Sequence, residues 1–257
     1  MTEILELLEL AKSATRAAGQ EFRTTKPASL RQVEASLLHG KEIKLAADRI
    51  LDDILLKQLL PTGISLLSEE SGLVRQGVDK DLTWIIDPLD GTVNYLRGIG
   101  PSAISVALWR GGCPLFGVLY SLNADVLSWG GKGLGAWSHE TPIQVSSIAH
   151  ANQAVVATGV PARFQTDDDE KVSRFCKLIT KFNKVRMIGS AASSLLLVAQ
   201  GNADAYVEDQ IMIWDVAAGL AILQGAGGVF AIDQESQTSP CRVLASNEHL
   251  LSTLVDG

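Results

Sequence analysis

The apolar positions near the start of the chain recur with the period of a helix. They fall on one face over residues 2–19 and again over residues 46–60, where Pro61 ends the pattern. The stretch between them, about 20–42, shows no clear period. We therefore expect two amphipathic helices near the start, joined by a loop or a mobile lid.

Two short apolar runs come next, and both end in acidic residues. "ISLLSEES" leads into Glu69 and Glu70, and "TWIIDPLDG" contains Asp87 and Asp90. Each run is typical of a buried strand, and "WII" is expected in the core. An aspartate at the end of a buried strand is costly unless its charge is compensated. Two such strand ends therefore suggest a functional site.

The remaining pattern changes near residue 140. Residues 104–137 contain β-prone runs separated by turn residues, as in an antiparallel sheet, and "GGKGLGAW" reads as a hairpin turn. After residue 140, strand-like and helix-like runs alternate. We predict an α+β protein of two layered halves, 1–140 and 141–257, without an internal repeat or a flexible linker.

Composition narrows the classes of function. The 257 residues are 46% hydrophobic and carry a formal net charge of −7, which argues against a protein that grips nucleic acid or anionic lipid. We find no signal-peptide pattern and no apolar run long enough to span a membrane, so we expect a cytoplasmic protein. Cys113, Cys176 and Cys241 lack metal-ligand spacing and are expected to be reduced structural thiols.

The acidic strand ends form a set of oxygen ligands. Glu69, Asp87 and Asp90 are hard donors, and Pro88 restrains the backbone so that the two aspartates and the Leu89 carbonyl converge. Mg²⁺ prefers such ligands and leaves other positions to water and phosphate. By itself, "DPLDG" is equally compatible with a simple β-turn.

Four further residues bear on the same site. If a helix starts after Asp90, the free amides of Gly91 and Thr92 create an anion site beside the metals. Asp215, in "IWDVAAGLAILQGAGG", is by itself a helix N-cap, and Asp48 by itself is an exposed acid in a first helical turn.

Taken together, "LLSEES", "WIIDPLDGTVNY" and "WDVAAG…AGG" resemble the inositol monophosphatase family of Mg²⁺-dependent, Li⁺-sensitive phosphatases. The likeness spans nearly the whole chain in the expected order. It implies an αβαβα layered sandwich, a homodimer, and two or three Mg²⁺ ions between the halves.

The resemblance also implies a metal-ligand set. Glu69, Asp87 and the Leu89 carbonyl would hold the first metal. Asp87, Asp90 and Asp215 would hold the second, and Glu69 would share a weaker third ion through water.

Catalytic roles follow from the same resemblance. Thr92, hydrogen-bonded to Asp48, would orient the attacking water and help to remove its proton. The amides of Gly91 and Thr92 would bind the phosphate.

Substrate residues lie further along the chain. "RMIGSAA" matches the family segment in which Gly189, Ser190 and Ala191 line the pocket, and Glu208 would accept hydrogen bonds from substrate hydroxyls. Gly225 departs from the pattern, because the family commonly has Glu there, and we expect altered packing rather than altered metal ligation. The stretch 20–42 is also hard to align.

The leading hypothesis is a phosphomonoesterase acting on inositol monophosphate or a related sugar or polyol phosphate, with no nucleic acid or membrane partner. One alternative is a 3′(2′),5′-bisphosphate nucleotidase, which needs basic residues for a second phosphate. Another is a catalytically silent relative that binds a phosphorylated metabolite.

Overall fold

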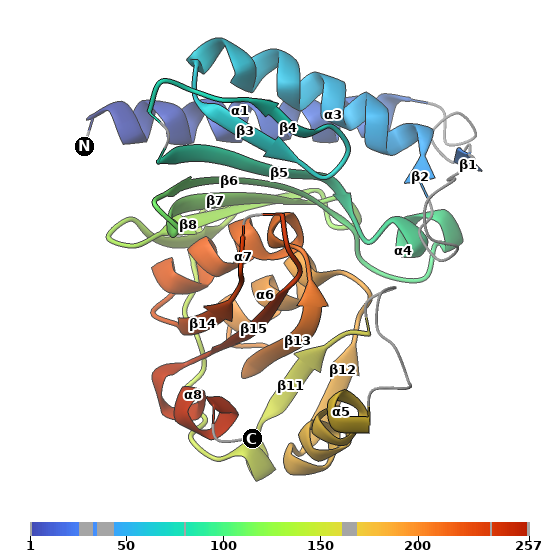
Figure 1. The fold of residues 1–257 in the computed structure, drawn as a ribbon, viewed down its shortest axis with the longest axis vertical. Coiled ribbons are helices and arrows are strands. Elements are labelled where there is room, and N and C mark those ends of the chain that lie inside the picture. The colour runs from blue at the N-terminus through green and yellow to red at the C-terminus, as the bar shows by residue number, and fades with distance from the viewer. Residues whose placement is uncertain are drawn as a thin grey trace.

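A computed structural model describes residues 2–25, 33–34, 44–79, 81–160, 169–236 and 238–255. Its helices and sheets alternate in five layers (Figure 1). Helices α1 and α3 cover one face of the first sheet, α6 and α7 lie between the two sheets, and α5 and α8 cover the far face of the second sheet. The predicted αβαβα sandwich is therefore confirmed. The helices are α1 (Thr2–Thr24), α3 (Ala46–Leu59), α4 (Thr92–Arg97), α5 (Asp169–Lys181), α6 (Ala191–Ala199), α7 (Ile213–Gly225) and α8 (Glu248–Val255).

The first large sheet of the described residues has eight strands in the order β10-β9-β8-β7-β6-β5-β3-β4. Neighbouring strands run antiparallel, except for β3 and β5, which are parallel. The strands are β3 (Ser65–Ser68), β4 (Gly72–Arg75), β5 (Leu82–Asp90), β6 (Ala103–Arg110), β7 (Cys113–Ser121), β8 (Val126–Gly131), β9 (Gly135–Ser138) and β10 (Thr141–Pro142).

The second sheet has five strands in the order β12-β11-β13-β15-β14. Strands β12, β11 and β13 are parallel, and β15 runs antiparallel between β13 and β14. A short pair, β1 (Val33–Glu34) with β2 (Lys44–Leu45), lies apart from both sheets. The five strands are β11 (Val155–Thr158), β12 (Lys184–Met187), β13 (Ala205–Ile211), β14 (Val229–Asp233) and β15 (Cys241–Ser246).

Three apolar clusters fill the spaces between the layers. As predicted for "WII", Trp84, Ile85 and Ile86 are buried. The middle cluster joins the inner face of the first sheet to α6 and α7 and to the second sheet. Because these helices follow residue 140 but pack on the first sheet, the proposed halves 1–140 and 141–257 share one core.

One prediction about local structure was wrong. Helix α1 does not end near Gly19 but continues to Thr24. A Cβ at Gly19 would lie 2.5 Å from the Tyr120 ring, so the glycine lets the helix pass close to β7. Asp215 lies near the N-terminal end of α7, as expected, but the alternative in which it is the N-cap does not hold, because the helix begins two residues earlier with Met212 as its cap. Most of the predicted loop or lid, residues 26–32 and 35–42, lies outside the described residues.

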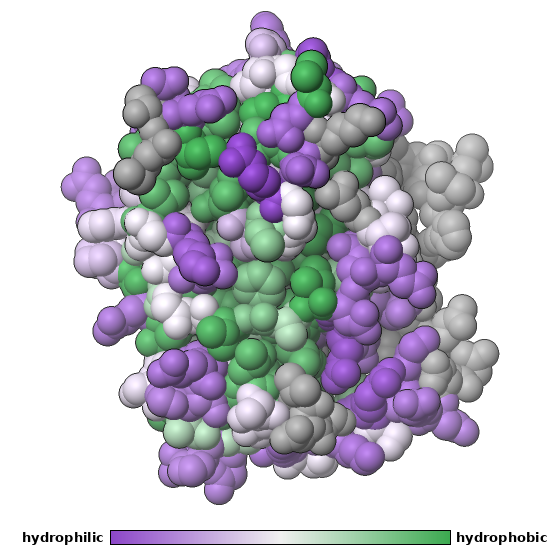
Figure 2. All heavy atoms as spheres, turned by 60° about the vertical axis from the view of Figure 1, so that its left-hand side comes forward, coloured by the Kyte–Doolittle hydropathy of each residue, from purple (hydrophilic) through white to green (hydrophobic). Residues whose placement is uncertain are grey.

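One face of the molecule carries a band of hydrophobic side chains bordered by hydrophilic ones (Figure 2). Apolar surface of this kind is ordinary in a folded protein. In the part of the chain that the structure describes, no helix has the length and apolar character needed to cross a membrane.

Candidate metal and phosphate site

The parallel pairing of β3 and β5 brings two acidic residues together. Ser68, the last residue of β3, is opposite Ile86, and the Glu69 amide donates a hydrogen bond to the Ile86 carbonyl at 3.1 Å. Glu69 and Asp87 therefore leave adjacent strands at the same edge of the sheet. The register thus explains why both apolar runs end in acids.

A third carboxylate arrives from α7. Asp215 lies in the first turn of this helix, where its Oδ2 accepts a hydrogen bond of 3.1 Å from the Met212 amide. Trp109 of β6 donates its indole N–H to the Ala217 carbonyl at 3.2 Å and so fixes the helix against the sheet. Ligand atoms of Asp215, Glu69 and Asp87 all lie within 4.8 Å of one another.

Asp87 is the most deeply buried member of this cluster. Its Oδ1 accepts a hydrogen bond of 2.9 Å from the Leu89 amide, but its buried Oδ2 has no hydrogen-bond partner among the described residues. Burial raises the pKa of Asp87 well above its usual range, and the charges of Glu69, Asp90 and Asp215 raise it further. The pKa of Asp215 is raised for the same reasons, burial first.

Such an arrangement is suited to a divalent cation. Three carboxylates that repel one another in a dry site are stabilised when a hard cation binds between their oxygens. The unpartnered Oδ2 of Asp87 offers one such oxygen. The residues present therefore fit a metal ion, with Glu69, Asp87 and Asp215 as its ligands.

Asp90 lies beside this cluster, but its carboxylate is bonded to the start of α6. Its Oδ2 accepts hydrogen bonds from the Ser190 hydroxyl and from the Ala192 amide at 2.9 Å, and Oδ1 accepts from the Ala191 amide at 3.2 Å. Burial raises the pKa of Asp90 to about 6, although these hydrogen bonds lower it. Ser190 and Ala191, predicted to contact substrate, thus contact a predicted metal ligand.

Thr92 and Asp48 come together although 44 positions separate them. Asp48 is buried in the first turn of α3, not exposed. The Thr92 hydroxyl lies 3.4 Å from Asp48 Oδ1 and 3.0 Å from the Leu89 carbonyl oxygen. A hydroxyl carries one proton, so Thr92 donates to one of these oxygens at a time. The lone pairs of its oxygen can still accept a hydrogen bond from another donor.

Gly91 has a structural reason to be glycine. It caps α4 with φ of 83°, and an added Cβ would lie 2.9 Å from the Pro101 carbonyl oxygen. Gly189 likewise has φ of 77°, and a Cβ there would lie 3.0 Å from Asn94. The two glycines thus allow close approach beside the site, Gly91 to the Pro101 backbone and Gly189 to the Asn94 side chain.

Glu208 is on β13 and buried. The Tyr206 hydroxyl donates to its Oε2 at 2.8 Å. Burial raises the pKa of Glu208 to about 7, with the hydrogen bond from Tyr206 opposing the shift and the charge of Asp90 adding to it. Glu208 is therefore electrostatically linked to the acids of the metal cluster.

Sequence reasoning missed the residues that hold these groups in place. Asp52 is buried on α3 and accepts a hydrogen bond of 2.6 Å from the Ser68 hydroxyl and another from the Ser71 hydroxyl, on either side of Glu69. Asn94 donates to the Pro101 carbonyl at 2.9 Å and to the Ile188 carbonyl at 2.7 Å. The spacing of Asp48 and Asp52, four residues apart in a helix, is the sequence signal that both face one side.

Comparisons with known proteins agree with this geometry. The inositol monophosphatase family model matches residues 3–255. An inositol-1-monophosphatase of Caulobacter vibrioides is 34% identical over 250 residues, covering 95% of this chain and 96% of the relative. A fructose-1,6-bisphosphatase/inositol-1-monophosphatase of Aquifex aeolicus is 34% identical over 236 residues, covering 90% of this chain and 88% of the relative.

The fold is also found among solved structures. An inositol monophosphatase from Anabaena (Nostoc) superimposes with a TM-score of 0.81 at 32% identity and covers 99% of this chain and 95% of its own. The chain belongs to the inositol monophosphatase family. It is a phosphatase of a metal-dependent class, as the resemblance implied.

Proposed function

We propose that this phosphatase hydrolyses inositol monophosphate or a related sugar or polyol phosphate with the help of Mg²⁺. The observation that carries the proposal is the cluster of Glu69, Asp87 and Asp215, in which a buried carboxylate oxygen has no partner. Two ions are proposed, with Glu69, Asp87 and the Leu89 carbonyl as ligands of one, and a weaker third ion held through Glu69. Asp87, Asp90 and Asp215 are the proposed ligands of the second.

When bound, the cations supply positive charge that neutralises phosphate oxygens and makes water more acidic. The chain's own contribution is to orient that water. Thr92 donates its proton to Asp48 or to the Leu89 carbonyl, so a lone pair of its hydroxyl oxygen accepts a hydrogen bond from water. Asp48 is positioned to take up the proton through Thr92, and the amides of Gly91 and Thr92 are proposed phosphate contacts.

We assign substrate selection to Glu208 of β13. Glu208 offers carboxylate oxygens to hydroxyl donors, which suits a polyol or a sugar. A second phosphate would meet negative charge from Glu208 and Asp90, which disfavours the bisphosphate nucleotide alternative. One relative is named for both fructose-1,6-bisphosphate and inositol monophosphate hydrolysis, so both classes belong in a substrate panel.

The test measures phosphate release from inositol monophosphate, fructose-1,6-bisphosphate and 3′,5′-bisphosphoadenosine, with calorimetry of Mg²⁺ binding alongside. We expect hydrolysis of the first, and loss of both Mg²⁺ binding and at least 10³-fold of kcat/KM, about 4 kcal/mol, in Asp87→Asn. The control, Asp81→Asn, changes an exposed acid just before the same strand and should retain activity. Exclusive hydrolysis of the nucleotide, or normal turnover by Asp87→Asn, would contradict the proposal.

A cytoplasmic location, expected from the lack of a signal-peptide pattern, remains a prediction, as do the sensitivity to Li⁺ and the homodimer that the family resemblance implies. So does the absence of a nucleic acid or membrane partner. Inhibition by LiCl in the same phosphate-release assay and sedimentation of the purified chain test the second and third of these.

A further inference from the structure

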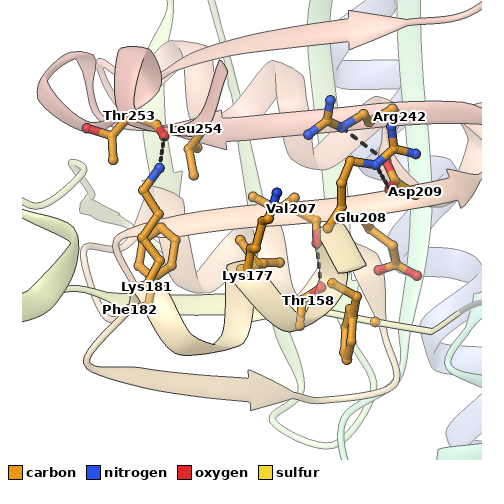
Figure 3. Close-up of a pocket in the computed structure, with 14 residues that line it drawn as sticks. Thr158, Lys177, Lys181, Phe182, Val207, Glu208, Asp209, Arg242, Thr253 and Leu254 are labelled. Carbon is orange, nitrogen blue, oxygen red and sulfur yellow. Dashed lines mark hydrogen bonds and ion pairs between the residues drawn. The ribbon is translucent and has the colours of Figure 1, made fainter. Parts of the chain in front are cut away.

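A pocket lies between α5 and the far face of the second sheet (Figure 3). Its walls come from α5, from β11, β13 and β15, and from the end of α8. The apolar part of the lining consists of Phe175, Leu178, Phe182, Val207 and Leu254. None of these five residues belongs to the acidic cluster.

The pocket exists because α5 packs loosely. Helix α5 has apolar residues on one side and charged residues on the other, yet none of its residues is buried. By contrast, the floor of the pocket is well packed, because Val207, Phe182 and Leu254 are buried and the Thr158 hydroxyl donates to the Val207 carbonyl at 2.6 Å. Apolar surface is therefore left accessible between the helix and the sheet.

Basic side chains surround this apolar floor. Arg174 and Arg242 both face Asp209, with Nε to carboxylate distances of 3.9 and 3.1 Å (Figure 3). Lys181 donates to the Thr253 carbonyl, and Lys177 points into the space between these groups. Among the lining residues, four cations thus meet two carboxylates, those of Asp209 and Glu208, in a protein whose net charge is −7.

The two arginines are incompletely satisfied. The Nε atoms of Arg174 and Arg242 are buried, but neither is aligned to donate a hydrogen bond to any of the described residues. A buried donor without an acceptor is costly, and an anion supplies acceptors. Both guanidinium groups share the Asp209 carboxylate, and Arg174 also meets the exposed Glu170 through Nη1 at 3.5 Å. Because four cations still face two carboxylates in the pocket lining, a further negative charge is favoured there.

We propose that this pocket binds a small amphipathic anion. The ligand class is a carboxylate, sulfonate or phosphate attached to an aromatic or aliphatic body. The body contacts Leu178, Phe182 and Val207, and the acidic head contacts Lys177 and Arg174. Burial of the body provides most of the affinity, and the cations select for negative charge.

The pocket is separate from the metal cluster. Along β13, Val207 and Asp209 face the pocket, whereas Tyr206 contacts the middle core. Glu208 alone belongs to both the pocket wall and the proposed substrate site. The proposal therefore does not depend on metal binding or turnover, and its test is carried out without metal.

The probe is 8-anilinonaphthalene-1-sulfonate, whose fluorescence rises in apolar sites, and its neutral counterpart is N-phenyl-1-naphthylamine. We expect one sulfonate to bind per chain, at least tenfold more tightly than the neutral amine. Lys177→Glu should weaken sulfonate binding about tenfold and leave binding of the amine unchanged. Leu178→Trp should fill the space and weaken both.

Two control variants locate the binding. Lys184→Glu reverses an exposed lysine of β12 outside the pocket, and Asp87→Asn alters the metal cluster; both should bind the sulfonate as the wild type does. Circular dichroism verifies folding of every variant. Equal sulfonate binding by wild type and Lys177→Glu, or weaker binding by Asp87→Asn, overturns the proposal. A change in the sedimentation of Lys177→Glu without a change in its affinity for the sulfonate also overturns the proposal. This face would then be a contact between two copies of the chain.

Discussion

Helices α7 and α5 both pack on a sheet, but they do so in opposite ways. A Cβ at Gly117 of β7 would lie 2.3 Å from the Ala218 carbonyl of α7, and one at Gly225 would lie 2.3 Å from the Gly135 carbonyl. Glycines thus allow α7 to approach the first sheet at backbone distance. Helix α5 has no buried residue at all.

The difference corresponds to what each interface holds. Asp215 must keep its place beside Glu69 and Asp87 with very little freedom, and the close packing of α7 provides this. The interface of α5 holds no member of the acidic cluster and leaves room for a ligand. Of these two interfaces, the closely packed one therefore holds the acid that the proposed chemistry needs in a fixed place.

The largest effect should separate the middle layer, which contains α7, from the interface of α5. Leu195 of α6 is fully buried and lies against Gly219 of α7, whereas Leu178 of α5 lines the pocket. Leu195→Ala should cost about 3 kcal/mol of unfolding free energy and Leu178→Ala about 1 kcal/mol. Urea denaturation followed by circular dichroism measures both, and equal costs would refute the contrast in packing.

A second prediction concerns pH. Burial raises the folded-state pKa of Glu208 to about 7, above the ordinary 4.5 of a glutamate side chain. The folded protein therefore binds this proton more tightly than the unfolded chain. Protonated Glu208 therefore contributes to the free energy of unfolding. This contribution is fully present below about pH 4.5 and is lost as the pH rises through about 7, and the loss amounts to roughly 3 kcal/mol.

Glu208→Gln imitates the protonated form and should remove this contribution to the pH dependence. In EDTA, the variant should be more stable than wild type at pH 8 and similar at pH 4.5, as measured by urea denaturation. Glu235→Gln, at an exposed acid, is the control. Parallel stability curves for wild type and Glu208→Gln would show that the glutamate is not desolvated.

The third prediction tests the close approach of α7. Gly225→Ala gains up to about 1 kcal/mol of helix propensity but forces the β8–β9 hairpin away. The steric cost is larger, so we expect a net loss of about 2 kcal/mol in thermal or urea unfolding. Gly227 has φ of 86°, and a Cβ added there would have no atom within 4 Å. Gly227→Ala therefore measures backbone strain alone and should lower the free energy of unfolding by less.

The smallest effect concerns α3, whose contact with the β3 turn is polar. Asp52→Asn keeps the shape of the side chain but weakens its hold on Ser68 and Ser71, which flank Glu69. We expect about tenfold weaker Mg²⁺ binding by calorimetry, with kcat recovered at saturating Mg²⁺. Asp53→Asn changes the exposed neighbour and should leave the affinity as it is. An unchanged affinity in Asp52→Asn would assign Asp52 to folding alone.

Most of the fold was predictable because its elements have strong periodic patterns. The two N-terminal helices, the strand runs before Glu69 and Asp87, and the β8–β9 hairpin turn were all visible in the sequence. Strand β15 and helix α8 were missed, because β15 follows a polar stretch and takes its place from pairing with β13 and β14. Gly19 was misread as a helix end because its partner, Tyr120, is distant in sequence.

The candidate site was predictable as a set of residues but not as a network. Acids at strand ends indicated the cluster of Glu69 and Asp87, and the family resemblance added Asp215. The bonding of Asp90 to the start of α6 was not visible, because it joins residues about 100 positions apart. The supporting role of Asp52 was missed for the same reason, since its partners become neighbours only when α3 docks on the sheet.

Asp48 and Asp52 stand one turn apart on the same helix, and each contacts a different strand end of the site. Any rotation or slide of α3 therefore displaces Thr92 and the turn that carries Glu69 together. The proposed water activation and the proposed metal binding are thus linked, because the single helix α3 positions the residues of both. Variants that loosen α3 should lose both properties in proportion, even when no residue of the acidic cluster is touched.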